Sequence, residues 1–588
     1  MVGLACVLVV VMYACNHDMA GKPDAPRGTG QYLPILDRGD GHMMYLMARS
    51  TAIDLDWVFD NDLARFGDPW NEPRTPTGRK SIVMPIGPAL VWTPLIWLSD
   101  AGAAVANLFG AEIPLHGYTL WTQRFVFLSS ALFGCAAVLL GAWLARRLAF
   151  GRWATAYATT AVLLGTSLTY YATFMPSYGH AMDAAICAAF LAWWAKTLGR
   201  TDARRWIVLG ALLGVAALVR VQEFAFGIVV LVELAFALRD RKAALRILAG
   251  GAITLVTALA VFTPQLLEWH LVFGSAFSLP QGAHYTRFGS PMIAELLWSP
   301  RNGWLVVHPI TYAGLIGLAL IPKQHRQIAV GLAAVVVVQI YLNSTIEDWW
   351  GGASFGQRRL CNVTLPLVVG TAALLSRLCR ASRRWLQHAA VVALFGTLVG
   401  INMFGVWNLR GGESAPSGPM QTCCRGVPPF VETLYEYLGN PLELPASAPF
   451  AIRHQVSLAR WDQLAGEYPL TPRFGSFRDD TLSGTHSAWL PTDEFLVGDW
   501  SSFQVGDRLF RATSHGRILV PILVPQPTAL AIWIKGSAAI EWDGDVIGRS
   551  TGDTWVRVAA TVDPSVGTHE LTIDGDRVDV GQIELELE

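Results

Sequence analysis

Residues 119–147 read TLWTQRFVFLSSALFGCAAVLLGAWLARR, an apolar run with one charged residue, Arg124, before it ends at Arg146 and Arg147. A helix needs roughly 20 such residues to cross the hydrocarbon core of a bilayer. The rest of the chain has the same character: 52% of its 588 residues are hydrophobic, 15% are charged, and the mean hydropathy is +0.37. Because soluble chains carry about 25% charged residues, we expect an integral membrane protein.

Composition also excludes two classes of protein. Forty-four basic and 45 acidic residues leave no surplus of positive charge for binding nucleic acid. The eight cysteines are too few for a disulfide scaffold, and they show no metal-ligand spacing. The 23 tryptophans and 14 tyrosines suit a protein that needs anchors at the two membrane surfaces.

Apolar runs predict about eleven transmembrane helices. We divide the block 206–238 in two, because it exceeds one span and because Arg220, Gln222 and Glu223 lie together at its centre. The segment 85–94 contains three prolines, so we expect it to lie in the membrane interface. The predicted spans are 1–15, 119–145, 153–174, 179–198, 206–222, 223–238, 246–267, 303–322, 327–345, 360–378 and 387–407.

Lysine and arginine occur in every second short loop, and such loops face the cytoplasm. This parity predicts a cytoplasmic N-terminus. It places the first loop (16–118) and everything after residue 408 outside. A signal peptide ending near Cys15 is the alternative for the first span, although Met12–Ala14 is a poor cleavage context.

The pattern changes in the C-terminal part of the chain. Residues 409–500 are rich in Pro, Gly and Ser and predict a linker with irregular structure. In residues 501–588, runs with alternating polarity are separated by turn signals, which predicts an extracytoplasmic β-sandwich. The sandwich resembles carbohydrate-binding jelly rolls. Trp533, Trp542 and Trp555 could stack on sugar rings or pack in the core.

Polar groups gather on the predicted outer side, where charges at membrane depth are expected to be functional. His180 and Asp183 would share one face of a helix, either directed into an outer cavity or capping the helix start. Arg358 and Arg359 oppose the positive-inside bias, and guanidinium groups bind phosphate well. The alternatives are anchoring of this pair to lipid headgroups and snorkelling of Arg220 to the surface.

Three segments are similar to segments of bacterial members of the GT-C superfamily, glycosyltransferases that use polyprenyl-phosphate sugars. Protein O-mannosyltransferases and lipid A aminoarabinose transferases are the nearest groups. The resemblance covers residues 1–408 and implies a GT-C-like transmembrane domain in the bacterial inner membrane. Gly41 and His42 stand where many members have a second acid after the first-loop Asp. The three segments are Gly39–Tyr45 (GDGHMMY), Pro85–Ala89 (PIGPA) and Asp348–Arg359 (DWWGGASFGQRR).

The resemblance implies that Asp40 is the general base of an inverting displacement, in which an acceptor hydroxyl attacks the anomeric carbon and polyprenyl phosphate leaves. Arg220, Arg358 and Arg359 would bind the donor phosphate and stabilise the leaving group. The acceptor would be a glycan, a lipid or a protein. Contacts to the sugar or the acceptor are expected from His42, His180, Asp183, His284, Tyr285, Arg301, Asn302, Asp348 and Trp349.

We expect no cofactor and no nucleic-acid partner. Asp40, His42, His180 and Asp183 would suit a divalent ion if they converged, but the sequence does not show that they do. A transporter or flippase of lipid-linked sugars is the alternative function. It would place charge deep in several spans, whereas the acids and arginines here lie at the predicted outer ends.

Overall fold

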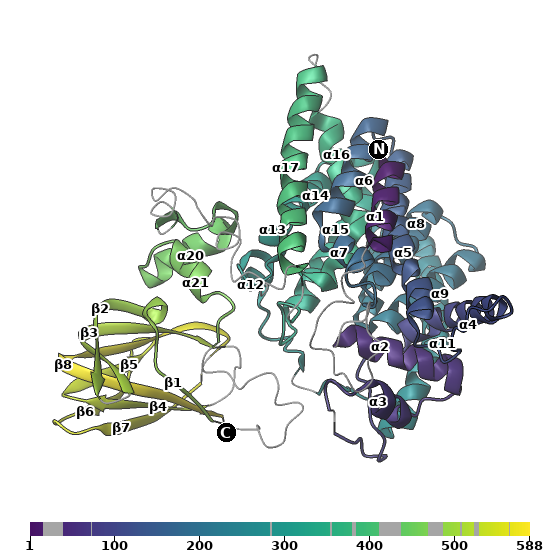
Figure 1. Ribbon diagram of the computed structural model, residues 1–588. Coiled ribbons are helices and arrows are strands. Elements are labelled where there is room, and N and C mark those ends of the chain that lie inside the picture. The colour runs from purple at the N-terminus through teal and green to yellow at the C-terminus, as the bar shows by residue number, and fades with distance from the viewer. Residues whose placement is uncertain are drawn as a thin grey trace. The chain divides into compact units, whose positions relative to one another are not determined.

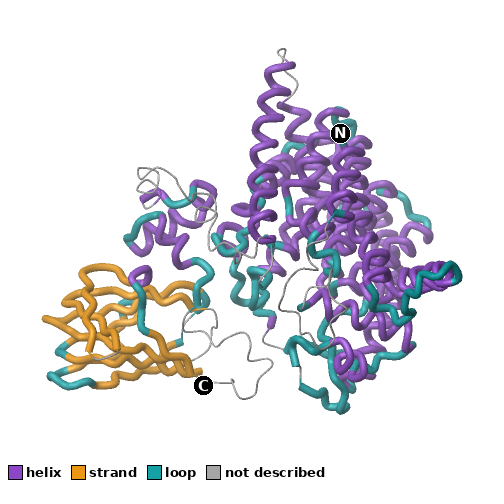
Figure 2. Tube along the Cα trace, in the orientation of Figure 1, coloured by secondary structure: helices purple, strands orange, loops and turns teal. Residues whose placement is uncertain are grey.

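The computed structural model forms two compact units, drawn in Figures 1 and 2. The helical unit contains Met1–Ala283, Val307–Asn343 and Ala353–Ala415. The sheet unit contains His284–Val306, Ser344–Gly352 and Pro416–Glu588. His284, most of the predicted linker and the start of the first loop lie outside the described residues. The structure describes residues 1–15, 39–71, 73–282, 285–352, 355–378, 384–410, 435, 437–468, 486–505, 508–522, 528–563 and 565–587.

The helical unit holds helices at all eleven predicted spans, and the general prediction of a multi-pass membrane protein agrees with this arrangement. By length and composition, five described segments suit a membrane span, so the count of eleven is not confirmed. These five are Gly87–Asn107, Leu120–Arg147, Arg241–Phe273, Lys323–Ser344 and Arg358–Leu378. The helices are α1 (Val2–Ala14), α2 (Asp40–Arg49), α3 (Asp60–Phe66), α4 (Gly87–Asn107), α5 (Leu120–Arg147), α6 (Arg152–Gly165), α7 (Ser167–Thr173), α8 (His180–Thr197), α9 (Ala203–Val219), η3 (Val221–Gly227), α10 (Ile228–Ala237), α11 (Arg241–Phe273), α14 (Ile310–Ala319), α15 (Arg326–Ser344), η6 (Arg358–Val363), α16 (Thr364–Leu378) and α17 (Arg384–Arg410).

The span predicted over 153–174 differs from the structure, because it is divided into α6 and α7 at Thr166. Thr166 has extended backbone angles, which interrupt the helical hydrogen bonds. The Asn402 side chain of α17 donates to the carbonyl oxygens of Leu164 and Thr166 at 2.9 and 3.2 Å. A broken helix is tolerated at membrane depth where a neighbouring helix satisfies its backbone in this way.

The proline-containing segment near residue 90 forms a continuous helix, α4, with Pro94 inside it. Its start is fixed by Gln265 of α11, whose side-chain oxygen accepts from the Ile86 N–H at 2.8 Å. Figure 1 shows α4 running across the direction of α16 and α17. The prediction that prolines interrupt this segment too much for a span is wrong, because α4 is one of the five segments whose length and composition suit a membrane span. Its position in the interface stays a prediction.

The sheet unit contains an antiparallel sheet of eight strands, as the period-two pattern predicts. β8 pairs with β3 as far as Val580 and with β4 from Asp579 onward, so it connects two sets of strands. Short helices also form inside the segment predicted as a linker. The elements of this unit are α12 (Ile293–Trp298), α20 (Leu444–His454), α21 (Ala459–Leu464), β1 (His486–Trp489), β2 (Leu496–Val505), β3 (Arg508–Ile522), β4 (Thr528–Lys535), β5 (Ala538–Trp542), β6 (Asp545–Ser550), β7 (Val556–Val562) and β8 (Gly567–Leu587), with α13 (Trp304–Val307) at its border.

The core of the sheet unit contains residues from most of its strands. Ile532, Ile573 and Val580 are fully buried or nearly so. Burial alternates along β5, whereas three consecutive residues of β3, Ile518–Val520, are all fully buried. Trp542 lies in this core with 7% of its surface exposed. Core packing is therefore the role of Trp542, whereas Trp533 and Trp555 are 36% and 37% exposed.

Candidate functional site

Asp40 begins α2 and forms an ion pair with Arg358, the first residue of η6. The distance from Asp40 Oδ2 to Arg358 Nη1 is 2.8 Å. The next residue, Gly41, allows α2 to pack closely, because a Cβ there would lie 2.1 Å from Ser177 Oγ in the turn before α8. The first-loop motif is thus held against the turn that leads to His180.

Aromatic rings support the arginine of this ion pair. The Arg358 guanidinium lies 5.1 Å from the centre of the Tyr178 ring, a cation–π contact. Tyr178 stacks on His180 with ring centres 5.8 Å apart, and Tyr171 meets His180 edge-on at 4.8 Å. His180 is 7% exposed. These rings fix Arg358 in place and make His180 part of the wall around it.

A second arginine reaches the same region from the end of α9. Arg220 Nη1 donates to the carbonyl oxygen of Arg359 at 2.9 Å and lies 3.5 Å from Asp183 Oδ2. Asp183 is fully buried in the first turn of α8. Arg220 therefore links α8 to the chain that carries Arg358 and Arg359.

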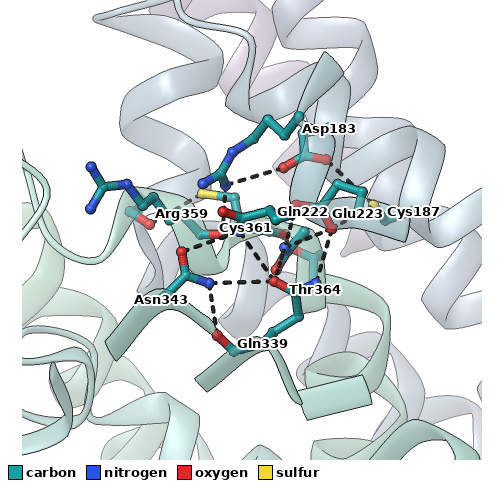
Figure 3. A network of polar contacts seen from close by, with 12 residues as sticks. Asp183, Cys187, Gln222, Glu223, Gln339, Asn343, Arg359, Cys361 and Thr364 are labelled. Carbon is teal, nitrogen blue, oxygen red and sulfur yellow. Dashed lines mark hydrogen bonds and ion pairs between the residues drawn. The ribbon is translucent and has the colours of Figure 1, made fainter. Parts of the chain in front are cut away.

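Behind Arg220, a buried polar network surrounds Glu223 (Figure 3). The Glu223 carboxylate accepts from Asn362 Nδ2 at 3.0 Å and from Gln339 Nε2 at 3.2 Å. Gln222 in turn donates to the side-chain oxygens of Gln339 and Asn343, at 3.3 and 3.2 Å. Figure 3 shows these side chains converging from several elements. Buried polar groups need hydrogen-bond partners, and two amide side chains supply them to Glu223.

The region as a whole is balanced in charge. The three guanidinium groups can attract an anion, although three carboxyl groups lie in the same region. Each guanidinium is held by a protein contact or by burial. The carboxyl groups of the region belong to Asp40, Asp183 and Glu223, and its guanidinium groups to Arg220, Arg358 and Arg359.

Within the part of the chain that the structure describes, one group has the proximity needed to hold a metal ion. The ligand atoms of Asp183, Cys187 and Glu223 lie within 4.8 Å of one another, and all three residues are buried. Asp183 is already paired with Arg220, and both Glu223 oxygens accept from Asn362. Zinc accepts thiolate and carboxylate donors, but here the Cys187 thiol itself donates to both carboxylates, at 3.4 and 3.7 Å. The fit is poor, and we derive no step through a metal.

His42 is held apart from this set. Its Nδ1 contacts the Tyr118 hydroxyl at 2.6 Å, its Nε2 contacts the carbonyl oxygen of Gly67 at 3.1 Å, and it is 3% exposed. Both ring nitrogens are therefore used inside the first loop. The divalent site considered for Asp40, His42, His180 and Asp183 would need a His42 nitrogen that these contacts occupy.

The remaining predicted contact residues lie in the sheet unit and hold its two early segments together. The Tyr285 hydroxyl donates to Asp348 Oδ1 at 2.8 Å, and Trp349 Nε1 donates to the Tyr468 hydroxyl at 3.1 Å. Asn302 Nδ2 donates to the carbonyl oxygen of Trp350 at 3.0 Å.

Arg301 is fixed in the same part of the sheet unit. Its guanidinium lies 4.0 Å from the centre of the Trp350 ring and donates to the carbonyl oxygen of Gly466. Burial lowers the pKa of Arg301, and the neighbouring Glu467 and Tyr468 oppose that shift.

Sequence reasoning missed several members of the polar network, namely Cys187, Gln339, Asn343 and Asn362. Gln339 and Asn343 are four residues apart in a strongly apolar helix, so they share one face. Two amide side chains on one face of a membrane helix need partners there. That spacing is the signal that could have found them.

No protein-family model matches the chain, and neither does any curated protein. Solved structures do show similarity. ArnT from Cupriavidus metallidurans in the apo state is 15% identical, with 72% of this chain and 73% of that chain covered and a TM-score of 0.42. The apo oligosaccharyltransferase of Archaeoglobus fulgidus is 13% identical, with 81% and 63% covered and a TM-score of 0.44. Arabinosyltransferase EmbB from Mycobacterium smegmatis is 11% identical, with 99% and 64% covered and a TM-score of 0.37.

At these identities and TM-scores, the similarity assigns no family, residue role, donor or acceptor to this chain.

Proposed function

We propose that the helical unit is a membrane glycosyltransferase that moves a sugar from a polyprenyl-phosphate-linked donor to an extracytoplasmic glycan, lipid or protein. The observation that carries the proposal is the 2.8 Å contact between Asp40 and Arg358. It puts a partly exposed carboxylate beside a guanidinium, in a region that also holds Arg220. A general base and a phosphate-binding cation are the two groups that this reaction needs.

In the proposed reaction, the donor phosphate binds the guanidinium of Arg358 in place of Asp40, which frees the Asp40 carboxylate. Asp40 then takes the proton from the acceptor hydroxyl as its oxygen bonds to the anomeric carbon. The bond from that carbon to the phosphate oxygen breaks with inversion. Arg220, Arg358 and Arg359 stabilise the negative charge that grows on the departing polyprenyl phosphate.

The buried network around Glu223 supports this arrangement indirectly, because it holds the arginines in position. Glu223 follows Arg220 closely in the chain, and its N–H donates to the carbonyl oxygen of Arg220 at 2.9 Å. By binding Asn362, Glu223 also ties the end of α9 to η6, which begins with Arg358. We assign the network to positioning the arginines and not to contact with the substrate.

The contacts to sugar and acceptor belong to the same proposal. His180 and Asp183 are assigned to the donor sugar, since they lie beside Arg358 and Arg220. Tyr285, Arg301, Asn302, Asp348 and Trp349 are assigned to the segments that meet the acceptor. The proposed setting is the bacterial inner membrane with a cytoplasmic N-terminus, as the loop charges predict.

The test measures release of polyprenyl phosphate by the full chain in lipid nanodiscs, with a panel of polyprenyl-phosphate sugars and a cell-envelope extract as acceptor. Asp40→Asn should lower turnover by about 10²–10⁴-fold, the contribution of a general base. Asp60→Asn is the matched control, because Asp60 pairs with Arg74 in the same loop at 2.7 Å and has no contact with the site.

Normal release by Asp40→Asn would contradict the proposal. If both proteins move the donor between leaflets equally and neither releases polyprenyl phosphate, the protein is a flippase and not a transferase.

A further inference from the structure

Four aromatic side chains form a row across the sheet unit, which we call the aromatic row: Phe503 of β2, Phe510 of β3, Trp533 of β4 and Trp555 just before β7. Phe503 and Phe510 are direct cross-strand partners, and their rings stack with centres 5.6 Å apart. Phe510 and Trp555 follow at 5.0 Å. These are ordinary distances for interacting rings.

A glycine at the middle of the row brings its two halves together. The pairing of Arg511 with Val580 sets Phe510 opposite Gly581 of β8. A Cβ on Gly581 would lie 3.3 Å from both Trp555 Cζ3 and Trp533 Cβ. The absence of a side chain there therefore lets the Trp555 ring lie on the β8 backbone between Phe510 and Trp533.

The row lies on the face of the sheet opposite the core. Ile532 and Ile534, which flank Trp533, are 1% and 0% exposed, and Val580 beside Gly581 is fully buried. Trp533 and Trp555 are each more than a third exposed. Phe503 and Phe510 beside them are half-buried. A partly exposed patch of four aromatic rings on the face away from the core indicates a binding surface.

The border of the row is polar and neutral. Trp533 Nε1 donates to Glu584 Oε1 at 2.8 Å, and Arg557 Nε donates to the other oxygen of the same carboxylate at 2.8 Å. The two charges thus compensate each other beside the rings. An anionic membrane surface would call for uncompensated Lys or Arg, whereas a neutral ligand with many hydroxyl groups matches this border.

We propose that the aromatic row binds a neutral glycan chain, whose sugar rings stack on the indole faces and the half-buried phenyl rings beside them while its hydroxyls meet the Glu584–Arg557 border. β8 lies between β3 and β4, so the strands from β2 to β7 are separated by four spacings of roughly 4.8 Å, about 19 Å in all, and the surface is longer than one sugar. The site is separate from the Asp40 region and does not depend on the reaction proposed there.

The experiment is hydroxyl-radical footprinting of the full chain in nanodiscs, with and without neutral hexasaccharides built from glucose, mannose or arabinose. Oxidation of Trp533 and Trp555 should fall when a hexasaccharide binds. Binding of the labelled sugar should weaken roughly tenfold or more in Trp555→Ala, since anchor rings dominate such surfaces, and should be partly kept in Trp555→Phe. Val546→Ala, an exposed apolar change on β6 outside the row, should leave binding unchanged.

Two results would overturn the proposal. One is an absence of protection by every hexasaccharide while the melting temperature of Trp555→Ala stays normal. The other is protection of both indoles by the nanodisc lipid alone, with full oxidation in detergent, which would make the row a membrane-docking surface. Because the experiment reads binding and not turnover, its failure is distinguishable from failure of the transferase proposal.

Discussion

Two arginine–carboxylate pairs in the helical unit differ in how completely they are enclosed. Arg205 and Glu233 form two contacts, 2.9 and 2.5 Å long, and their side chains are 1% and 5% exposed. Arg205 also donates to the carbonyl oxygen of Arg200 and lies over the Trp206 ring. Asp40 and Arg358 share one contact of 2.8 Å, and their side chains are 23% and 10% exposed.

This difference separates a structural pair from one that can exchange partners. The Arg205–Glu233 pair joins α9 to α10 and has its hydrogen bonds filled by protein groups. The Asp40–Arg358 pair is open on one side, so a phosphate could replace the carboxylate on Arg358. The Asp40–Arg358 pair is the candidate site because it is less enclosed than the Arg205–Glu233 pair. The presence of a salt bridge alone does not indicate a site.

The largest predicted effect is the loss of stability when the enclosed Arg205–Glu233 pair is broken. Glu233→Gln leaves the buried Arg205 guanidinium without a charge partner and should lower the free energy of unfolding by about 3–5 kcal/mol. Thermal unfolding in detergent measures this. The double variant Arg205→Met, Glu233→Leu should recover most of the loss, since an apolar pair of similar volume is often neutral. An unchanged melting temperature in Glu233→Gln would remove the structural role.

The next effect is on activity. Arg358→Gln should lower kcat/KM for the lipid-linked donor by about 10²–10³-fold, because the leaving phosphate loses a preorganised cation. Its melting temperature should change little, in contrast to Glu233→Gln. The matched control is Arg74→Gln, which breaks an exposed ion pair in the first loop. A loss of stability in Arg358→Gln as large as that in Glu233→Gln would erase the distinction between the two pairs.

A buried carboxyl beside another carboxyl gives the smallest effect. In the sheet unit, burial and the neighbouring Asp462 raise the pKa of Glu443 to about 11. The folded unit therefore holds a proton that the unfolded chain releases above its usual pKa of 4.5. The contribution of Glu443 to stability is complete below that value and declines as the pH rises toward 11.

The corresponding measurement is the melting temperature of the sheet unit at pH 6 and pH 9. Wild type should melt lower at pH 9. Glu443→Gln should flatten the difference and raise stability at pH 9 by at least about 1 kcal/mol. Asp553→Asn, at an exposed turn position, should keep the wild-type slope. Equal slopes in wild type and Glu443→Gln would show that Glu443 is not the group that titrates.

Hydropathy and period predict the elements of this fold well and their irregularities poorly. Helices occur within all eleven segments predicted as spans, although five described segments have the length and composition of a membrane span. The break at Thr166 depends on Asn402, more than 200 residues later, and no local pattern contains that contact. The α4 segment keeps a helix through Pro94 despite its prolines.

The roles of the candidate site residues stay predictions. His180, Asp183, Arg220, Arg358 and Arg359 are recognisable from the sequence as polar residues near apolar segments, whereas Asp40 comes from the family resemblance. The fold places all six in the helical unit. His42 is recognisable in the same way, but its two ring nitrogens already contact the Tyr118 hydroxyl and the Gly67 carbonyl oxygen. Likewise, Trp542 and Trp533 look alike in the sequence, and only the register of the strands shows which one is in the core.

The most direct measurement is polyprenyl phosphate binding by Asp40→Asn, made beside its turnover in the same nanodiscs. If Asp40 is the base and Arg358 the phosphate ligand, removing the carboxylate charge frees Arg358. The variant should then bind polyprenyl phosphate at least as tightly as wild type while its turnover falls by about 10²–10⁴-fold. Binding that weakens in step with turnover, or turnover that survives, would contradict the account.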